Sequence, residues 1–173
     1  MSKPASSAAL PIAYAVLRIL IIVNWMSGAF IAAGLFVANR QWILRAFHLF
    51  PSSDADRLII ALRAIAALGL VGIPLNYLVF RRLLEIVETV RAGDPFVAAN
   101  ALRLRAIGWT LLALQLLSLA IGAIANAVST PAHPLHLQAG FSVSGWLAVL
   151  LTFLLGSVFA QGTLMREDLE GMV

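Results

Sequence analysis

The stretch RAGDPFVAANALRLRAIGW, residues 91–109, decides how this chain folds. It is the longest polar interruption between strongly apolar segments. Gly93 can adopt the left-handed conformation that ends a helix. Asp94 is a favourable N-cap, and Pro95 suits the first turn of the helix that follows. The stretch therefore predicts a tight turn between two helices, the second of which starts at Asp94 and Pro95.

The composition indicates that lipid surrounds most of the chain. Hydrophobic residues make up 61% of its 173 residues and charged residues 12%, whereas soluble domains carry about 25% charged residues. The net charge is +4, but the basic residues are spread over the ends of apolar segments and do not form the patch or stripe that binds nucleic acid. We therefore expect an integral membrane protein whose main partner is the lipid bilayer and that does not bind nucleic acid directly.

Four apolar spans predict an all-α fold, a membrane four-helix bundle that forms a single domain over residues 1–173. The first span is too long for the apolar region of a cleaved signal peptide, so we expect it to remain as a membrane helix. Helix-forming polar sequence follows the second span and precedes the third. Helices two and three should therefore extend beyond the membrane as a helical hairpin. The spans cover about residues 12–38, 58–80, 107–127 and 138–160.

The distribution of basic residues predicts the sides of the membrane. Four spans put both termini and the central turn on one side. That side carries Lys3, Arg18, Arg81, Arg82, Arg91, Arg103, Arg105 and Arg166, and the other side carries Arg40, Arg45, Arg57 and Arg63. Because basic residues next to membrane helices concentrate on the cytoplasmic side, we expect a multi-pass protein of the bacterial inner membrane with both termini in the cytoplasm.

Residues 39–57 connect the first two spans and allow two interpretations. Ile43, Phe47 and Phe50 share one helical face, which is typical of a short helix lying in the membrane interface. A simple continuation of the first helix is the alternative. Ser53 then resembles the start of a capping box that opens the second helix.

The polar end of the second helix carries two predicted ion pairs. Arg81 and Glu85 are spaced i,i+4, and Glu88 and Arg91 are spaced i,i+3. Both spacings bring side chains together on the surface of a helix. They indicate that this helix continues to about Arg91, beyond the apolar span.

Two motifs give the sequence a resemblance to a known family. The first is AGDPF at residues 92–96, followed by Asn100 and by LRLR at residues 102–105; the second is MREDLEG at residues 165–171, preceded by Gly162. On these motifs the chain resembles DUF2975, a family of small four-helix inner-membrane proteins of unknown function. Its members are often encoded beside a small helix-turn-helix regulator of the Cro type. The resemblance thus suggests a regulatory partner in the cytoplasm.

The turn and the C-terminal tail form a candidate cytoplasmic interaction motif. Phe96, Asn100 and Arg103 recur at i, i+4 and i+7 and so share one helical face. Two interpretations stay open: an internal network, in which Arg103 pairs with Glu85 and the tail acids pair with nearby arginines, or a docking surface for a cytoplasmic protein. The motif comprises Gly93, Asp94, Pro95, Phe96, Asn100, Arg103, Arg105, Arg166, Asp168, Glu170 and Gly171.

No pattern in the sequence predicts catalysis or a cofactor. The chain lacks cysteine, and it contains no nucleophile elbow, phosphate-binding loop or zinc-helix signature. No histidine lies within a span to ligate haem. His48, His133 and His136 share the outer side and are metal-ligand types, but Pro134 breaks any helical presentation of the last two. We therefore predict neither enzyme activity nor a metal or other cofactor.

The polar residues inside the spans bear on transport. They are Asn24, Arg63, Asn76 and Gln115. Ion-coupled carriers usually hold a carboxylate or histidine within the membrane, whereas Asn and Gln more often form hydrogen bonds between helices. The leading prediction is a non-enzymatic membrane partner or modulator, with a helix-turn-helix transcriptional regulator as a candidate partner. The alternative is a small transporter or exporter subunit, assembled as a homo-oligomer through Gly- and Ala-rich faces.

Overall fold

The computed structural model describes residues 6–46, 53–129 and 139–170, and the regular secondary structure of these residues is entirely helical. A short helix lies between the first two of four long ones. The helices are α1 (Ser6–Val37), α2 (Arg40–Ala46), α3 (Ser53–Arg91), α4 (Ala98–Val128) and α5 (Val143–Glu170). The prediction of an all-α fold with four long helices is confirmed.

Each long helix is long and apolar enough to cross a membrane. A spanning helix needs about 20 apolar residues, which match the thickness of the hydrocarbon core. The apolar segments are Ala9–Val37, Ala55–Arg91, Ala98–Val128 and Val143–Arg166. Large apolar side chains along them, such as Phe30 and Leu154, are exposed on the surface of the chain. The chain is therefore a multi-pass membrane protein.

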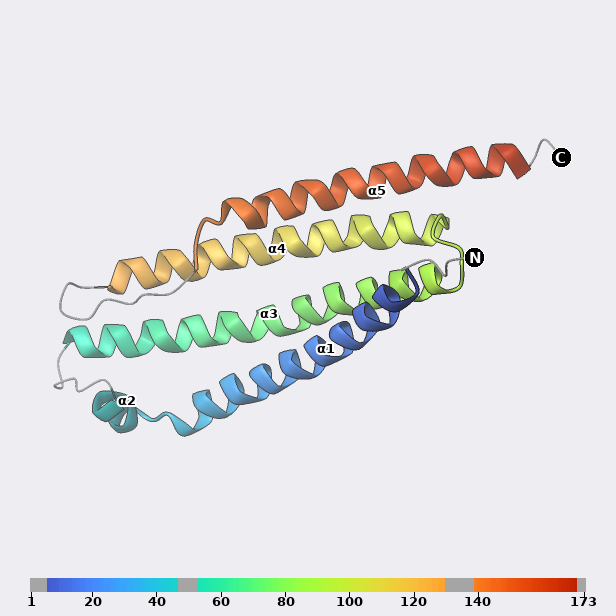
Figure 1. The fold of residues 1–173 in the computed structure, drawn as a ribbon. Helices are drawn as coiled ribbons and strands as arrows, with labels where there is room; N and C mark the ends of the chain where they lie inside the picture. The colour runs from blue at the N-terminus through green and yellow to red at the C-terminus, as the bar shows by residue number, and fades with distance from the viewer. Residues whose placement is uncertain (1–5, 47–52, 130–138, 171–173) are drawn as a thin grey trace.

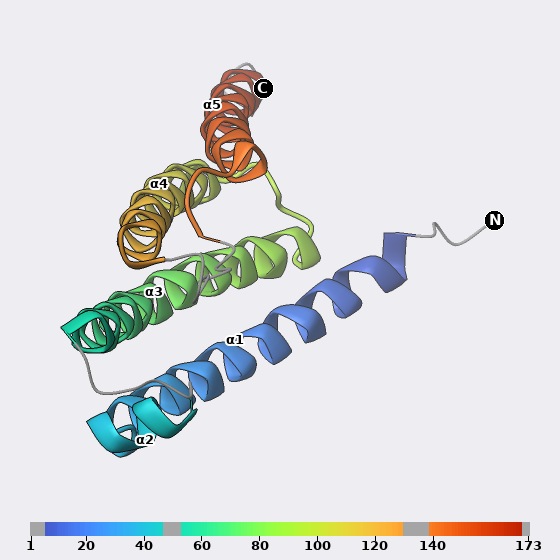
Figure 2. The same ribbon diagram turned by 90° about the vertical axis from the view of Figure 1, so that its left-hand side faces the viewer.

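The four long helices form a curved row. α1 packs on α3, α3 on α4, and α4 on α5, and within the described residues α1 does not approach α4 or α5. Both ribbon views show this order across the molecule (Figures 1 and 2). The arrangement is thus more open than a compact bundle, because α1 and α5 each have only one long helix as a neighbour.

The first connection contains a separate short helix. Asn39 caps α2, since its side-chain oxygen accepts a hydrogen bond from the Trp42 backbone N–H at 2.8 Å. Ile43 is buried against the start of α3. The continuous-helix alternative is therefore excluded. Phe47 and Phe50, which share the predicted face with Ile43, lie outside the described residues.

One buried polar contact joins α1 to α3. The Asn24 side-chain nitrogen donates to the backbone carbonyl of Ile73 at 3.0 Å. One turn further along α1, a Cβ on Gly28 would lie 3.1 Å from the Ile73 side chain. Asn24 thus forms the interhelical hydrogen bond that is expected of a polar residue inside a span.

The segment before α5 packs directly on α4. The backbone N–H of Gly140 donates to Ser118 Oγ at 3.1 Å. One turn along α4, a Cβ on Gly122 would lie only 2.7 Å from the Gly140 Cα. The missing side chain at Gly122 therefore allows this backbone to cross the helix.

Candidate functional site

The turn between α3 and α4 lies at the end of the molecule where α1 begins and α5 ends (Figure 1). Gly93 has a φ of +86°. Its backbone N–H donates to Val90 O at 3.1 Å, and the Asp94 N–H donates to Thr89 O at 3.1 Å. This pair of bonds is the Schellman motif, which satisfies the last carbonyls of a helix. The helix stop predicted at Gly93 is confirmed.

The start of α4 differs from the prediction. α4 begins at Ala98, and its N-cap is Val97, which forms no side-chain capping bond. Asp94 and Pro95, predicted as N-cap and first helical residue, lie instead in the turn. The reason is that the Asp94 N–H is still bonded to α3, so the chain needs further residues before it can turn into a new helix.

Asn100 is a fully buried residue that ties the turn to both helices. Its Nδ2 donates to Thr89 Oγ1 at 2.7 Å and to the Pro95 carbonyl at 2.9 Å. Its Oδ1 accepts from Arg103 Nη1 at 2.9 Å. Both donors of the amide and its acceptor are therefore used, which fixes the position of the turn.

Arg103 extends this network along α3. Its Nε donates to one carboxylate oxygen of Glu85 at 3.1 Å, and the other oxygen accepts from Arg81 Nε at 3.2 Å. The predicted pairs of Glu85 with Arg103 and with Arg81 are confirmed. The internal-network interpretation therefore accounts for the Arg103 side chain.

The predicted Glu88–Arg91 pair does not form. The Arg91 guanidinium lies instead over the ring of Tyr14, 5.2 Å from its centroid, and the Arg18 guanidinium lies at the same distance. Arg18 also donates to the Tyr14 hydroxyl at 2.7 Å. These contacts connect the first part of α1 to the end of α3.

The turn also packs against the second half of α5. The ring centroids of Phe96 and Phe159 lie 5.4 Å apart. A Cβ on Gly162 would come within 3.0 Å of the Phe96 ring. The Asp94 carboxylate forms an ion pair with Arg166. Because Phe159, Gly162 and Arg166 are spaced i, i+3 and i+7, one face of α5 receives the whole turn.

The structure thus joins the turn to Arg166, the first residue of the predicted polar tail, with three qualifications about other residues. Arg105 does not enter the network and lines a groove between α4 and α5. The side chains of Asp168 and Glu170, and Gly171 as a whole, lie outside the described part of the chain. The sequence did not indicate Thr89 or Phe159, although Phe159 is seven residues before Arg166 and thus on its face.

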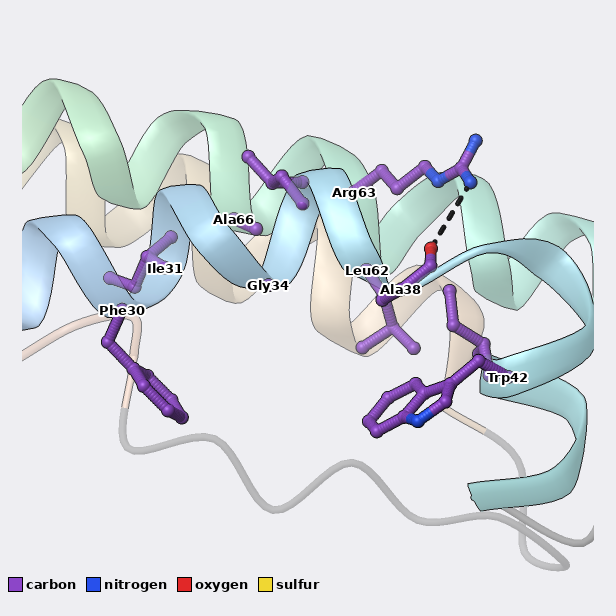
Figure 3. Close-up of a pocket in the computed structure, with 10 residues that line it drawn as sticks. Phe30, Ile31, Gly34, Ala38, Trp42, Leu62, Arg63 and Ala66 are labelled. Carbon is purple, nitrogen blue, oxygen red and sulfur yellow. Dashed lines mark hydrogen bonds between the residues drawn. The ribbon is translucent and has the colours of Figure 1, made fainter.

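A second groove lies at the opposite end of the molecule, between α1, α2 and α3. It encloses about 280 Å³, and its lining includes Phe30, Trp42 and Arg63. Arg63 Nη2 donates to the Ala38 carbonyl at 3.4 Å. In Figure 3 the rings of Phe30 and Trp42 project to the opposite side of the view from this guanidinium. The groove therefore offers a ligand an apolar surface.

The metal site that we considered from the sequence is not tested by the structure. His48, His133 and His136 all lie outside the described residues. Among the residues that are described, no three His, Asp or Glu side chains gather to hold a metal ion.

Comparison with known proteins returns one family. Residues 37–173 match the family described as "Protein of unknown function (DUF2975)". The match includes α2 to α5, the turn and the tail, and it begins at the last residue of α1. No curated protein and no solved structure matches the chain.

Proposed function

Because this chain belongs to the DUF2975 family, whose description assigns no function, we propose a role from its own geometry. The protein acts in the bacterial inner membrane as a non-enzymatic partner or modulator of a cytoplasmic protein. A helix-turn-helix transcriptional regulator is the partner that the family resemblance suggests. Both termini and the hairpin end of α3 and α4 face the cytoplasm.

The charge distribution supports this orientation. The hairpin end carries Arg81, Arg82, Arg103 and Arg105, together with Arg166 of α5. Basic residues next to membrane helices are retained on the cytoplasmic side during insertion. The hairpin end is also the more basic one, which makes it the cytoplasmic end of our proposal.

The observation that carries the docking role is an exposed apolar pair beside the turn. Leu164 and Met165 of α5 are 60% and 63% exposed. Gly156 packs against α4 at Arg105, and Met165 lies about 13 Å further along α5 at 1.5 Å per residue. If Arg105 marks the lipid headgroups, this pair faces water. Exposed apolar surface in water is typical of protein interaction sites.

The polar network supports the same role, because it makes the turn rigid without a partner. Asp94, Asn100 and Arg103 each form a hydrogen bond or an ion pair within the chain. A preformed surface binds with a smaller entropic cost than one that must be ordered first. The side chains around the network then recognise the partner protein.

A photo-crosslinking amino acid at Met165 tests the proposal in intact cells. We expect a crosslink to one soluble protein, identified by mass spectrometry, and loss of its copurification from a Met165→Glu variant. The matched control position is Leu154, which is also exposed on α5 but lies within the span of about residues 138–160 predicted from the sequence; it should crosslink to lipid. Crosslinking of Met165 to lipid alone would contradict the docking role.

Single-cysteine labelling tests the orientation separately, since the native chain has no cysteine. Ala92 is a better position than Gly93, whose φ of +86° strains any other residue. An impermeant thiol reagent should label Ala46→Cys from outside the cytoplasmic membrane and leave Ala92→Cys unlabelled. The opposite pattern would invert the proposed topology.

A small transporter subunit is the second candidate. One observation favours it: within the described residues, Gln115 Oε1 and Trp146 Nε1 are buried without a hydrogen-bond partner. Unpaired polar atoms inside a membrane can mark a solute or water path. Solute flux into liposomes that disappears in a Gln115→Met variant would support this candidate over the first.

A further inference from the structure

A groove of about 430 Å³ runs between α4 and α5 near the hairpin end. Arg105 and Trp109 line it from α4, and Phe153, Gly156 and Ser157 line it from α5. Trp109 is 58% exposed and its ring meets Phe153 edge-on, with 5.4 Å between the ring centroids. The groove therefore combines one cation with an aromatic wall and is open to the surroundings of the protein.

Arg105 carries a charge that has no ion-pair partner among the described residues. Arg103, two residues earlier, points to the other side of α4 because two residues correspond to about 200° of helical rotation. Arg103 is bound by Glu85. Arg105 is exposed and forms no ion pair within the described part of the chain. Its exposed guanidinium can therefore receive an anion.

The polarity of the groove changes along the membrane normal. Trp109 follows Arg105 by four residues, which is about 6 Å along the helix toward the apolar span. Tryptophan favours the boundary between headgroups and hydrocarbon, and arginine favours the headgroup phosphates. A phospholipid has the same order of groups, from its phosphate to its acyl chains.

We propose that this groove is a binding site for one anionic phospholipid of the bilayer. The phosphodiester lies at Arg105, and one acyl chain runs past Trp109 and Phe153 toward the membrane centre. Charge complementarity selects an anionic lipid, because a zwitterionic headgroup brings its own cation beside the phosphate. The inference concerns a different surface from the docking role proposed above and a lipid partner, and both proposals place Arg105 at the headgroups.

The groove at the opposite end supplies an internal comparison. It is also lined by one arginine and one tryptophan, Arg63 and Trp42. There, however, the guanidinium donates to the Ala38 carbonyl, and the pocket itself is apolar. We therefore expect lipid acyl chains at Trp42 without selection for a charged headgroup.

Fluorescence quenching by brominated lipids measures both sites in the full-length chain. One variant keeps only Trp109 and another keeps only Trp42, with the other tryptophans replaced by phenylalanine. Each variant is reconstituted into two kinds of phosphatidylcholine vesicle. In the first, added phosphatidylglycerol carries bromine on its acyl chains. In the second, an equal fraction of the phosphatidylcholine carries the bromine instead. At equal mole fraction we expect brominated phosphatidylglycerol to occupy the Trp109 site about fivefold more than brominated phosphatidylcholine. Trp42 should be quenched equally by the two lipids.

Three variants of the Trp109-only chain locate the selectivity. Arg105→Gln should abolish the preference while quenching by phosphatidylcholine persists, and Arg105→Lys should retain most of it. Arg82→Gln is the control, because Arg82 is a nearby arginine of α3 that does not line the groove. Equal quenching of Trp109 by both lipids would overturn the proposal, as would a preference that survives Arg105→Gln or is lost equally with Arg82→Gln.

Discussion

Asp94 in the turn between α3 and α4 pairs with Arg166 of α5, a residue 72 positions further along the chain. The two side chains are 42% and 46% exposed, so solvent screens the pair. Its role is therefore to align the turn with α5, whereas the buried amide of Asn100 fixes the turn itself. These two interactions lead to different predictions.

The Asp94–Arg166 pair should contribute little to the free energy of unfolding. A double-mutant cycle of Asp94→Asn and Arg166→Gln should give a coupling energy of roughly 0.2–1 kcal/mol, as is typical of exposed ion pairs. The cycle removes the effects of other contacts of Arg166 from the result. Unfolding of the purified protein in mixed micelles measures it, and added salt should reduce it. A coupling energy of zero at low salt would show that the pair does not stabilise the fold.

Asn100→Ala should destabilise the protein more strongly. It leaves the Pro95 carbonyl without the donor at 2.9 Å and removes an acceptor from Arg103. Unsatisfied buried polar groups cost about 1–3 kcal/mol. The same unfolding measurement on Asn126→Ala is the control, since Asn126 is an exposed asparagine of the same helix. Equal losses in the two variants would refute the special role of Asn100.

Gly122→Ala should lower the free energy of unfolding by about 1–3 kcal/mol, because overpacking against a rigid neighbour is costly. The new Cβ would lie 2.7 Å from the Gly140 Cα and 2.9 Å from the Ala139 carbonyl oxygen. Neither backbone atom can move aside as a side chain could. Gly34→Ala is the matched control. Gly34 is a helical glycine, and an added Cβ there would have nothing within 4 Å. The free energy of unfolding of this variant should therefore equal or exceed that of the unmodified protein.

Gln115→Met should preserve or increase stability. The variant keeps a similar volume and removes a carbonyl oxygen that is buried without a partner within the described residues. Replacing such an orphan by an apolar group is nearly neutral or stabilising. A large loss in the unfolding experiment would reveal that Oε1 has a partner, such as water or a bound solute, in the membrane.

The helices and the turn between α3 and α4 could be predicted because their signals are local in sequence. A left-handed residue was needed to end α3, and Gly93 provides it. In an antiparallel hairpin, residues at equal distances from the turn lie opposite each other. Glu85 and Arg103 are both nine residues from Asp94, which explains why their ion pair was predicted correctly.

The order of the helices and the role of Asp94 could not be predicted in this way. In a soluble protein an apolar stripe reveals the packed face of a helix. In lipid, apolar residues surround the helix and the stripe is lost, so nothing in the sequence indicated that α1 would contact only α3 among the long helices. Asp94 obeys the local rule for an N-cap, but its backbone bond to Thr89 overrides that rule.

The curved row of helices has a consequence for biogenesis. Among the long helices, each one packs on the one made immediately before it: α3 on α1, α4 on α3 and α5 on α4. Contacts between successive elements form rapidly and expose little unpaired surface along the way. Each long helix can therefore pack against the long helix synthesised before it as soon as it is inserted. No pair of packed helices has to separate to admit a helix that is synthesised later.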